Sequence, residues 1–195
     1  MAQQFYELTR KGSQCPVDVA TAKSYMRVST TVDDSLIQLF LDGATDYAEK
    51  YTGREFRVNR WSLFLDDFPA RICLRRDPVD SIVKITRLVS GVATTVAAAV
   101  YYIKRSTQFT EVLLNEDQEW PSDQDDIEHS IEVNFETKVH RCVDQVKLGI
   151  LRHVAFMYEN RGDCDPIEVG SGVSHDSAAQ SGATKLYDQI RISRV

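Results

Sequence analysis

The stretch that decides the fold is Thr31–Phe56, TVDDSLIQLFLDGATDYAEKYTGREF. Its apolar residues recur at steps of three and four, which predicts an amphipathic helix over residues 33–52. The stripe comprises Leu36, Ile37, Phe40, Leu41, Ala44, Tyr47, Ala48 and Tyr51. We expect Thr31, three residues before Asp34, to cap the amino end, and Gly53 to end the helix in the left-handed conformation.

Two further helices are predicted. Asp18 is a suitable N-cap for a short helix over residues 19–27, which needs a neighbour to pack on. A third helix over residues 142–160 has one apolar stripe of Val143, Val146, Ile150, Val154 and Met157 and a second of Leu148, Leu151, Ala155 and Tyr158. A helix with two apolar faces is either deeply buried or packs against two partners, so we expect the second stripe to be a subunit interface. Gly149 costs about 1 kcal/mol relative to alanine in mid-helix, which indicates a close approach to the backbone there.

From residue 57 the apolar period changes from 3.6 to 2, which indicates strands. We expect strands near residues 61–65, 72–74, 79–88 and 131–135, and a hairpin of residues 101–103 and 109–114. Ser90-Gly91 is a turn signal. The fold class is therefore α+β: a small helical bundle from residues 17–56 and 139–161, with an inserted β module at residues 57–138.

The two ends of the chain have a different character. Residues 1–16 are polar, with Gly12, Ser13 and Pro16, and are expected to be a flexible or partner-dependent arm. Residues 162–184 are rich in glycine and serine and predict a flexible linker. Residues 185–195 regain apolar side chains, which suit a strand added to the sheet edge of another protein. The alternative is a tail that folds back on its own β module.

Charge limits the partners of the protein. The net charge is −6, and residues 116–128 hold seven acidic residues and no basic one. This balance argues against tight nucleic-acid binding. The basic residues of the β module are either a solvated face or a patch for phosphate or an acidic protein surface. They are Arg71, Arg75, Arg76, Lys84, Arg87, Lys104 and Arg105. No run of about 20 apolar residues predicts a membrane helix, and no signal peptide is visible.

No catalytic or metal site emerges, and no cofactor is expected. His140, Cys142, His153 and Cys164 match no compact zinc spacing, and the four cysteines, which include Cys15 and Cys73, predict free thiols in a reducing compartment. Asp123, Asp125, Asp126 and Glu128 lack the glycine and spacing of a calcium loop. Ser174-His175-Asp176 are sequence neighbours and cannot form a triad on a flexible loop. A metal-dependent soluble enzyme remains the alternative from another class.

An ordered set of short motifs carries a family resemblance. A short helix ends at Arg27-Val28, and the long helix closes on Tyr47-Ala48-Glu49-Lys50-Tyr51-Thr52-Gly53-Arg54. Trp61-Ser62-Leu63, Phe68-Pro69-Ala70, Trp120-Pro121 and Tyr158-Glu159-Asn160-Arg161 follow. Over about residues 17–161 the chain resembles the head–tail connector (adaptor) proteins of long-tailed phages and of related particles such as gene transfer agents.

The resemblance implies a structural, non-enzymatic subunit of a phage or phage-like particle, assembled in the host cytoplasm. Copies would form a dodecameric ring below the portal protein, extend the DNA channel without sequence-specific binding, and present a platform to a stopper or other tail-completion protein. The portal-binding tail would comprise Leu186, Tyr187, Ile190, Arg191, Ile192, Arg194 and Val195. An acidic channel or rim loop would comprise Glu116, Asp117, Glu119, Asp123, Asp125 and Asp126. Another ring of the tail machine, a stopper or terminator, is the alternative.

Overall fold

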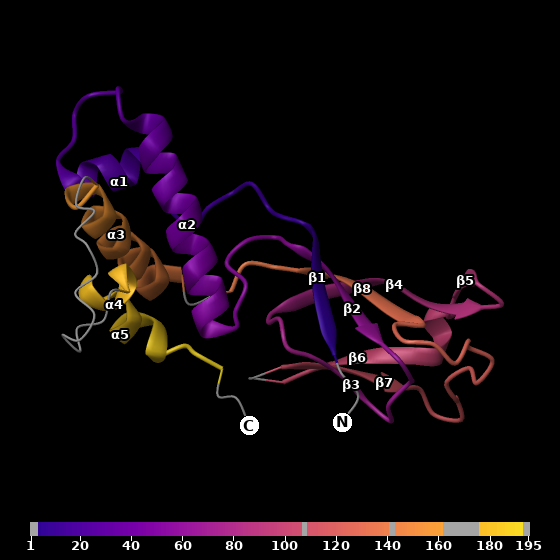
Figure 1. The fold of residues 1–195 in the computed structure, drawn as a ribbon. Helices are drawn as coiled ribbons and strands as arrows, with labels where there is room; N and C mark the ends of the chain where they lie inside the picture. Colours follow the sequence, from indigo (N-terminus) through magenta and orange to yellow (C-terminus); the bar gives the residue numbers. More distant parts are fainter. Residues whose placement is uncertain (1–3, 107–108, 141–142, 162–175, 193–195) are drawn as a thin grey trace, which may run out of the picture. The chain divides into compact units, whose positions relative to one another are not determined.

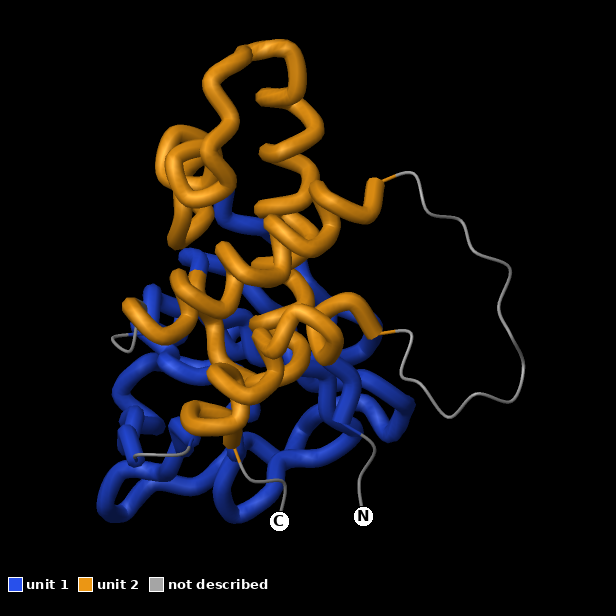
Figure 2. Tube along the Cα trace, turned by 90° about the vertical axis from the view of Figure 1, so that its left-hand side faces the viewer, with its two compact units in different colours: residues 1–14, 57–140 blue, residues 15–56, 141–195 orange. Residues whose placement is uncertain are grey.

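The computed structural model describes residues 4–106, 109–140, 143–161 and 176–192. Within these ranges the chain has an α+β fold with five α-helices and two antiparallel sheets (Figure 1). The chain divides into two compact units, coloured separately in Figure 2. The β unit comprises residues 1–14 and 57–140, and the helical unit comprises residues 15–56 and 141–195. None of the helices in the described ranges has the length and apolar character needed to cross a bilayer.

The helical unit contains α1 (Val19–Met26), α2 (Asp34–Thr52), α3 (Val143–Glu159), α4 (Ser177–Gln180) and α5 (Ala183–Asp188). Two predicted caps are confirmed: the Asp18 carboxylate accepts a hydrogen bond from the Thr21 N–H at 2.7 Å, and Gly53 ends α2 with φ 73°. The predicted cap at Thr31 is wrong. Asp33 occupies the N-cap position of α2, and its carboxylate accepts a hydrogen bond from Tyr158 Oη at 2.6 Å instead of capping the helix.

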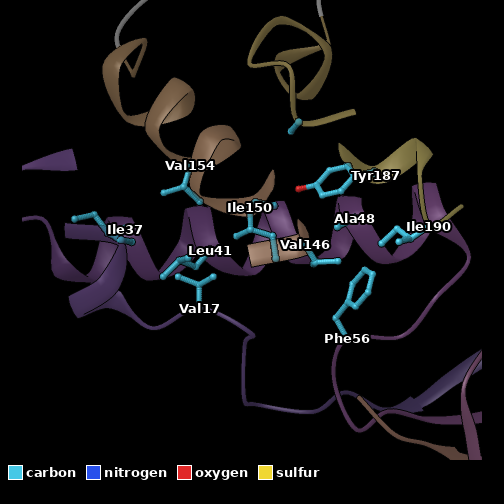
Figure 3. Packing of buried hydrophobic residues seen from close by; sticks show 13 residues of the cluster. Val17, Ile37, Leu41, Ala48, Phe56, Val146, Ile150, Val154, Tyr187 and Ile190 are labelled. Atoms are coloured by element: carbon cyan, nitrogen blue, oxygen red, sulfur yellow. The ribbon is translucent and has the colours of Figure 1, made fainter. Parts of the chain in front are cut away.

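One apolar core holds the helical unit together (Figure 3). Ile37, Leu41, Ala44 and Ala48 of α2 and Val146, Ile150 and Val154 of α3 are all fully buried. These residues belong to the predicted stripes, and burial of each large aliphatic side chain contributes about 1.5–3 kcal/mol. Ala183, Tyr187 and Ile190 from the end of the chain belong to the same core, which the sequence analysis did not foresee.

The described residues of the β unit form eight strands. They are β1 (Phe5–Arg10), β2 (Arg60–Leu65), β3 (Ile72–Leu74), β4 (Val79–Val89), β5 (Val92–Thr95), β6 (Tyr101–Arg105), β7 (Thr110–Leu114) and β8 (Ile131–Thr137). They form a five-stranded sheet in the order β1-β2-β8-β4-β5 and a three-stranded sheet in the order β3-β7-β6. A single cluster of buried residues takes side chains from both sheets, including Leu63, Ile72, Val112 and Phe135.

The predicted Ser90-Gly91 turn and the predicted hairpin pairing in the β unit are confirmed. The β4–β5 hairpin turns at Ser90 and Gly91, and their positive φ values of 53° and 75° match the twist of the two strands. Strands β6 and β7 form the predicted hairpin. Strand β8 lies in the middle of the five-stranded sheet and buries Ile131, Val133 and Phe135, as its alternation predicts.

The predictions for the two ends of the chain need correction. Residues 1–16 are not simply a flexible arm, because Phe5–Arg10 forms β1 and pairs with β2 along the edge of the sheet. In the predicted tail strand, residues 185–188 instead belong to the helix α5 (Ala183–Asp188), and residues 193–195 lie outside the described residues. Residues 162–175 of the predicted linker lie outside the described residues, whereas residues 176–184 include α4 and the start of α5.

Candidate assembly surfaces

The C-terminal segment, residues 176–192, packs against α3 at Gly149. A Cβ at position 149 would lie 2.4 Å from Cε1 of Tyr187, a distance that real Cβ atoms essentially never show, and 3.0 Å from its Cζ. The predicted close approach at Gly149 is therefore confirmed, and its cause is the aromatic ring of Tyr187. This side chain is fully buried, and burial raises the pKa of its hydroxyl.

Two tyrosines of α2 bind carboxylates of the same segment. Tyr47 Oη donates to Asp176, and Tyr51 Oη donates to Asp188 Oδ1 at 2.6 Å. The pKa of Tyr47 is raised by burial and by this hydrogen bond, and the pKa of Tyr51 is raised chiefly by its bond to Asp188. Tyr47 and Tyr51 stand four residues apart and were predicted only as members of the apolar stripe. The carboxylates that bind their hydroxyl groups were not predicted.

A buried histidine joins α3 to α4. His153 is 3% exposed, and its Nε2 lies 2.8 Å from Ser177 Oγ. The ring stands edge-on to Tyr47, and its Nδ1 has no hydrogen-bond partner among the described residues. Burial lowers the pKa of His153, while the nearby carboxylate of Asp176 opposes that shift. The neutral imidazole is therefore the form that fits this packing.

The end of the segment continues along α2. Arg54 Nε donates to the Ile190 carbonyl at 2.6 Å, and the Ile192 N–H donates to the Thr52 carbonyl at 2.9 Å. Ile192 also covers the position above Gly53 where a Cβ would lie. The tail therefore folds back on the helical unit through backbone and side-chain contacts.

The residues predicted to bind the portal fall into four groups. Tyr187 and Ile190 are buried in the chain's own core, whereas Leu186 and Ile192 are half-buried. Arg191 is exposed and lies over the Tyr51 ring at 4.8 Å. Arg194 and Val195 lie outside the described residues. The portal contact itself stays a prediction.

The second stripe of α3 is mostly used within the chain. Leu151 and Tyr158 are half-buried and pack against the core of the helical unit, and Ala155 is half-buried. Leu148 is 38% exposed. The helices α4 and α5, which were not predicted, pack against α3 within the chain. A subunit contact at this stripe stays a prediction, and Leu148 is its most exposed member.

The acidic segment, residues 116–128, is fixed to the β4–β5 hairpin by two of its own carboxylates. Asp123 pairs with Arg87 through contacts of 2.7 and 3.0 Å, which lowers the pKa of Asp123. Asp125 accepts hydrogen bonds from the Ser90 and Gly91 N–H groups, both at 2.8 Å. Trp120 stacks on Phe68 with ring centroids 4.7 Å apart. These contacts hold the segment in a defined position.

The remaining acidic side chains of this segment point to solvent. Glu116, Asp117, Glu119, Asp126 and Glu128 are exposed, and in the described part of the chain none of them forms an ion pair. The predicted channel or rim residues therefore divide into two structural carboxylates and four that are available to a partner.

The basic residues of the β unit do not form one patch. On the three-stranded sheet, Arg71 and Lys104 share the carboxylate of Glu111, at 3.4 and 3.9 Å. Arg75 is exposed and directly follows β3. The other four are placed elsewhere: Arg76 lies over the Trp61 ring, Lys84 is on β4, Arg87 binds Asp123, and Arg105 donates to the Val79 and Asp80 carbonyls.

The described residues hold no candidate metal site. No group of three or more His, Cys, Asp or Glu side chains among the described residues could hold an ion. Cys15 and Cys73 are free thiols, and Cys15 Sγ donates to Asp42 at 3.2 Å. Cys142, Cys164, Ser174 and His175 lie outside the described residues.

Comparison with solved structures finds the same fold along nearly the whole chain. A chain in the neck of an empty GTA particle computed with C6 symmetry matches with a TM-score of 0.75 and 16% identity, over 98% of this chain and 97% of that one. A chain in the virion of a native gene transfer agent particle gives 0.73 and 16%, with the same coverage. A chain in the neck of a native GTA particle computed with C12 symmetry gives 0.68 and 18%, over 100% and 97%.

A family comparison covers most of the sequence as well. None of the curated proteins matches the chain. Residues 16–191, which include both units, match the family described as "Phage gp6-like head-tail connector protein". The chain therefore belongs to the phage gp6-like family of head–tail connector proteins, which are structural components of the virion and not enzymes.

Proposed function

We propose that copies of this connector assemble as a twelve-membered ring below the portal of the capsid, where they extend the DNA channel and join head to tail. The observation that carries the proposal is the family match over residues 16–191. A second observation supports the ring: the fold recurs along the whole chain in a particle neck computed with C12 symmetry. Closed rings are the usual outcome of a head-to-tail contact whose rotation closes.

The charge of the chain suits a DNA channel. Each copy carries a formal −6, so a ring of copies would be strongly acidic. An acidic wall repels the phosphate backbone and lets DNA slide past without specific binding. The partner at the far end of the channel would be a stopper or another tail-completion protein.

We assign the portal contact to the C-terminal end of the chain, in which some residues anchor the segment and others meet the portal. Tyr187 and Ile190 anchor the segment to its own helical unit, since both are buried there. Arg191 is exposed, and we propose that it meets the portal together with Arg194 and Val195 at the chain end. Subunits would touch through the face of α3 that carries Leu148.

A head–tail joining assay tests this function. Particles produced without the chain should accumulate DNA-filled heads and separate tails, and purified chain added to that extract should restore joined particles. Joined, stable particles in the absence of the chain would overturn the proposed role.

A further inference from the structure

The outer face of the three-stranded sheet is a cationic surface that the fold leaves open. Ile72 and Val112 point into the core, so their neighbours Cys73 and Glu111 belong to the opposite face. Arg71 and Lys104 flank Glu111, with side chains that are 68% and 61% exposed. Arg75 is exposed and directly follows β3. Tyr102, 46% exposed and two residues before Lys104, adds apolar area.

The acidic segment of the same chain starts at the other end of this sheet. Lys104 pairs with Glu111, and Arg105 pairs with Thr110, near the β6–β7 turn. The opposite end of β7 is Leu114, and the chain then passes through Asn115, which is bound to the Val100 carbonyl at 2.9 Å. At about 3.4 Å per residue, Leu114 lies about 10 Å along the strand from Glu111, and the acidic segment begins two residues further on.

The two surfaces carry opposite charge, and the single carboxylate of Glu111 offsets only part of the positive charge of Arg71 and Lys104. Among the described residues, the one ion pair of the acidic segment is Asp123 with Arg87, and none reaches Arg71, Arg75 or Lys104. The segment also exposes an apolar side chain, Ile127 at 53%, between Asp126 and Glu128. Each surface thus combines charge with apolar area, which is typical of a protein–protein contact.

We propose that the cationic sheet face of one copy binds the acidic segment of the adjacent copy in the ring. This inference rests on the proposed ring. Each copy carries both surfaces at separate places in its β unit, so a head-to-tail contact uses each of them once and can repeat around a closed ring. It assigns Glu116, Asp117, Glu119 and Asp126 to the subunit contact and not to the channel wall.

Nucleic acid is a poorer occupant of the same face. Glu111 lies at its centre, beneath Arg71 and Lys104, and a carboxylate in that position repels phosphate. An acidic peptide segment can instead bind the cations from the side, and it matches the excess of acid in this chain. Such charge pairs mainly set the specificity and register of a contact, and they weaken with salt.

A charge-exchange experiment tests the inference. The face variant carries R75E and K104E, the segment variant carries E119K and D126K, and the exchanged variant carries all four substitutions in one chain. The matched control carries K50E and K84E, at exposed lysines off this face. Ring assembly is measured for the full chain by sedimentation at about 0.1 M salt, with and without portal protein.

We expect the face and segment variants each to assemble at least about tenfold more weakly than the wild type, with unchanged melting. The exchanged variant, with the wild-type net charge, should regain assembly, and the control should assemble normally. Wild-type assembly in the face or segment variant, or no recovery in the exchanged variant, would refute the contact while leaving the ring in place. Binding of duplex DNA is measured for the same variants. If the face variant loses DNA binding but still assembles, the face is assigned to DNA instead. If the wild type forms no ring in either condition, the proposed function fails and this inference with it.

Discussion

Gly149 and Tyr187 fit one another: the tyrosine ring occupies the space where any larger residue at position 149 would place its Cβ, 2.4 Å from Cε1. This pair fastens the C-terminal segment to α3. It gives the tail a structural role within the chain, in addition to any role in partner binding.

The first prediction concerns Gly149→Ala. Alanine favours the helix by about 1 kcal/mol over glycine, but here the new methyl group must displace the Tyr187 ring. We expect a net loss of stability and faster hydrogen exchange in α5, measured by urea unfolding and mass spectrometry. Gly43→Ala is the matched control, because that α2 glycine has open space around it and the substitution should stabilise by up to about 1 kcal/mol. Equal stabilisation by the two alanines would contradict the account.

The second prediction separates the ring of Tyr187 from its hydroxyl. Tyr187→Ala removes a buried aromatic side chain and should cost about 3–5 kcal/mol of unfolding free energy. Tyr187→Phe should be neutral or slightly stabilising, because the buried hydroxyl has no hydrogen-bond partner among the described residues. Urea unfolding of both variants checks this. A large loss in the phenylalanine variant would show that the hydroxyl has a partner.

The third prediction is a pH dependence from His153. Its native pKa lies below the ordinary value of about 6.5 because the ring is buried between α3, Tyr47 and α4, and Asp176 only partly offsets this. The unfolded chain therefore takes up a proton at a higher pH than the native chain does. The stability that comes from the neutral ring is present above about pH 6.5 and is lost as pH falls toward the native pKa, by at most about 1.4 kcal/mol per pH unit.

The variant His153→Gln isolates this effect. It should show a shallower loss of stability below pH 6.5 than the wild type, while His129→Gln, at an exposed histidine of the β unit, should follow the wild type. Unfolding free energies from pH 7.5 to 5 provide the comparison. Parallel curves for wild type and His153→Gln would show that this histidine does not control the transition.

The fourth prediction concerns truncation after Ser181. This deletion removes Ala183, Tyr187 and Ile190 from the core of the helical unit. We expect at least about 3 kcal/mol of lost stability and a lower melting temperature for that unit, with the β unit unaffected. Differential scanning calorimetry measures both transitions. A melting profile identical to that of the full chain would mean that the tail is not part of the core.

Local signals predicted the parts of the fold that local physics controls. The period of α2, the glycine at its end and the Ser90-Gly91 turn each depend on residues within a few positions, so their structure follows from the sequence. Gly149 also gave a usable signal, since a glycine in mid-helix needs a reason. Its partner, 38 positions further on, left no trace in the local pattern.

The missed elements depend on distant partners. Strand β1 is a mostly exposed edge strand whose place is fixed by pairing with β2, and its polar sequence looked like an arm. In the tail, Ile190 and Ile192 alternate with arginine as in a strand, yet the preceding residues form α5 because Tyr187 packs on α3. Short helices of this kind are stable only through tertiary contacts. The assembly surfaces are harder still to predict from the sequence, because only charge and shape indicate which partner an exposed side chain binds.

The most direct test of the central claim is the native mass of the chain in complex with its portal protein, with the chain alone measured in parallel. The account predicts a discrete ring in which twelve copies of the chain are bound to the portal. A complex with only one or two copies, or no complex at saturating concentration, would contradict the claim that this connector forms the ring below the portal.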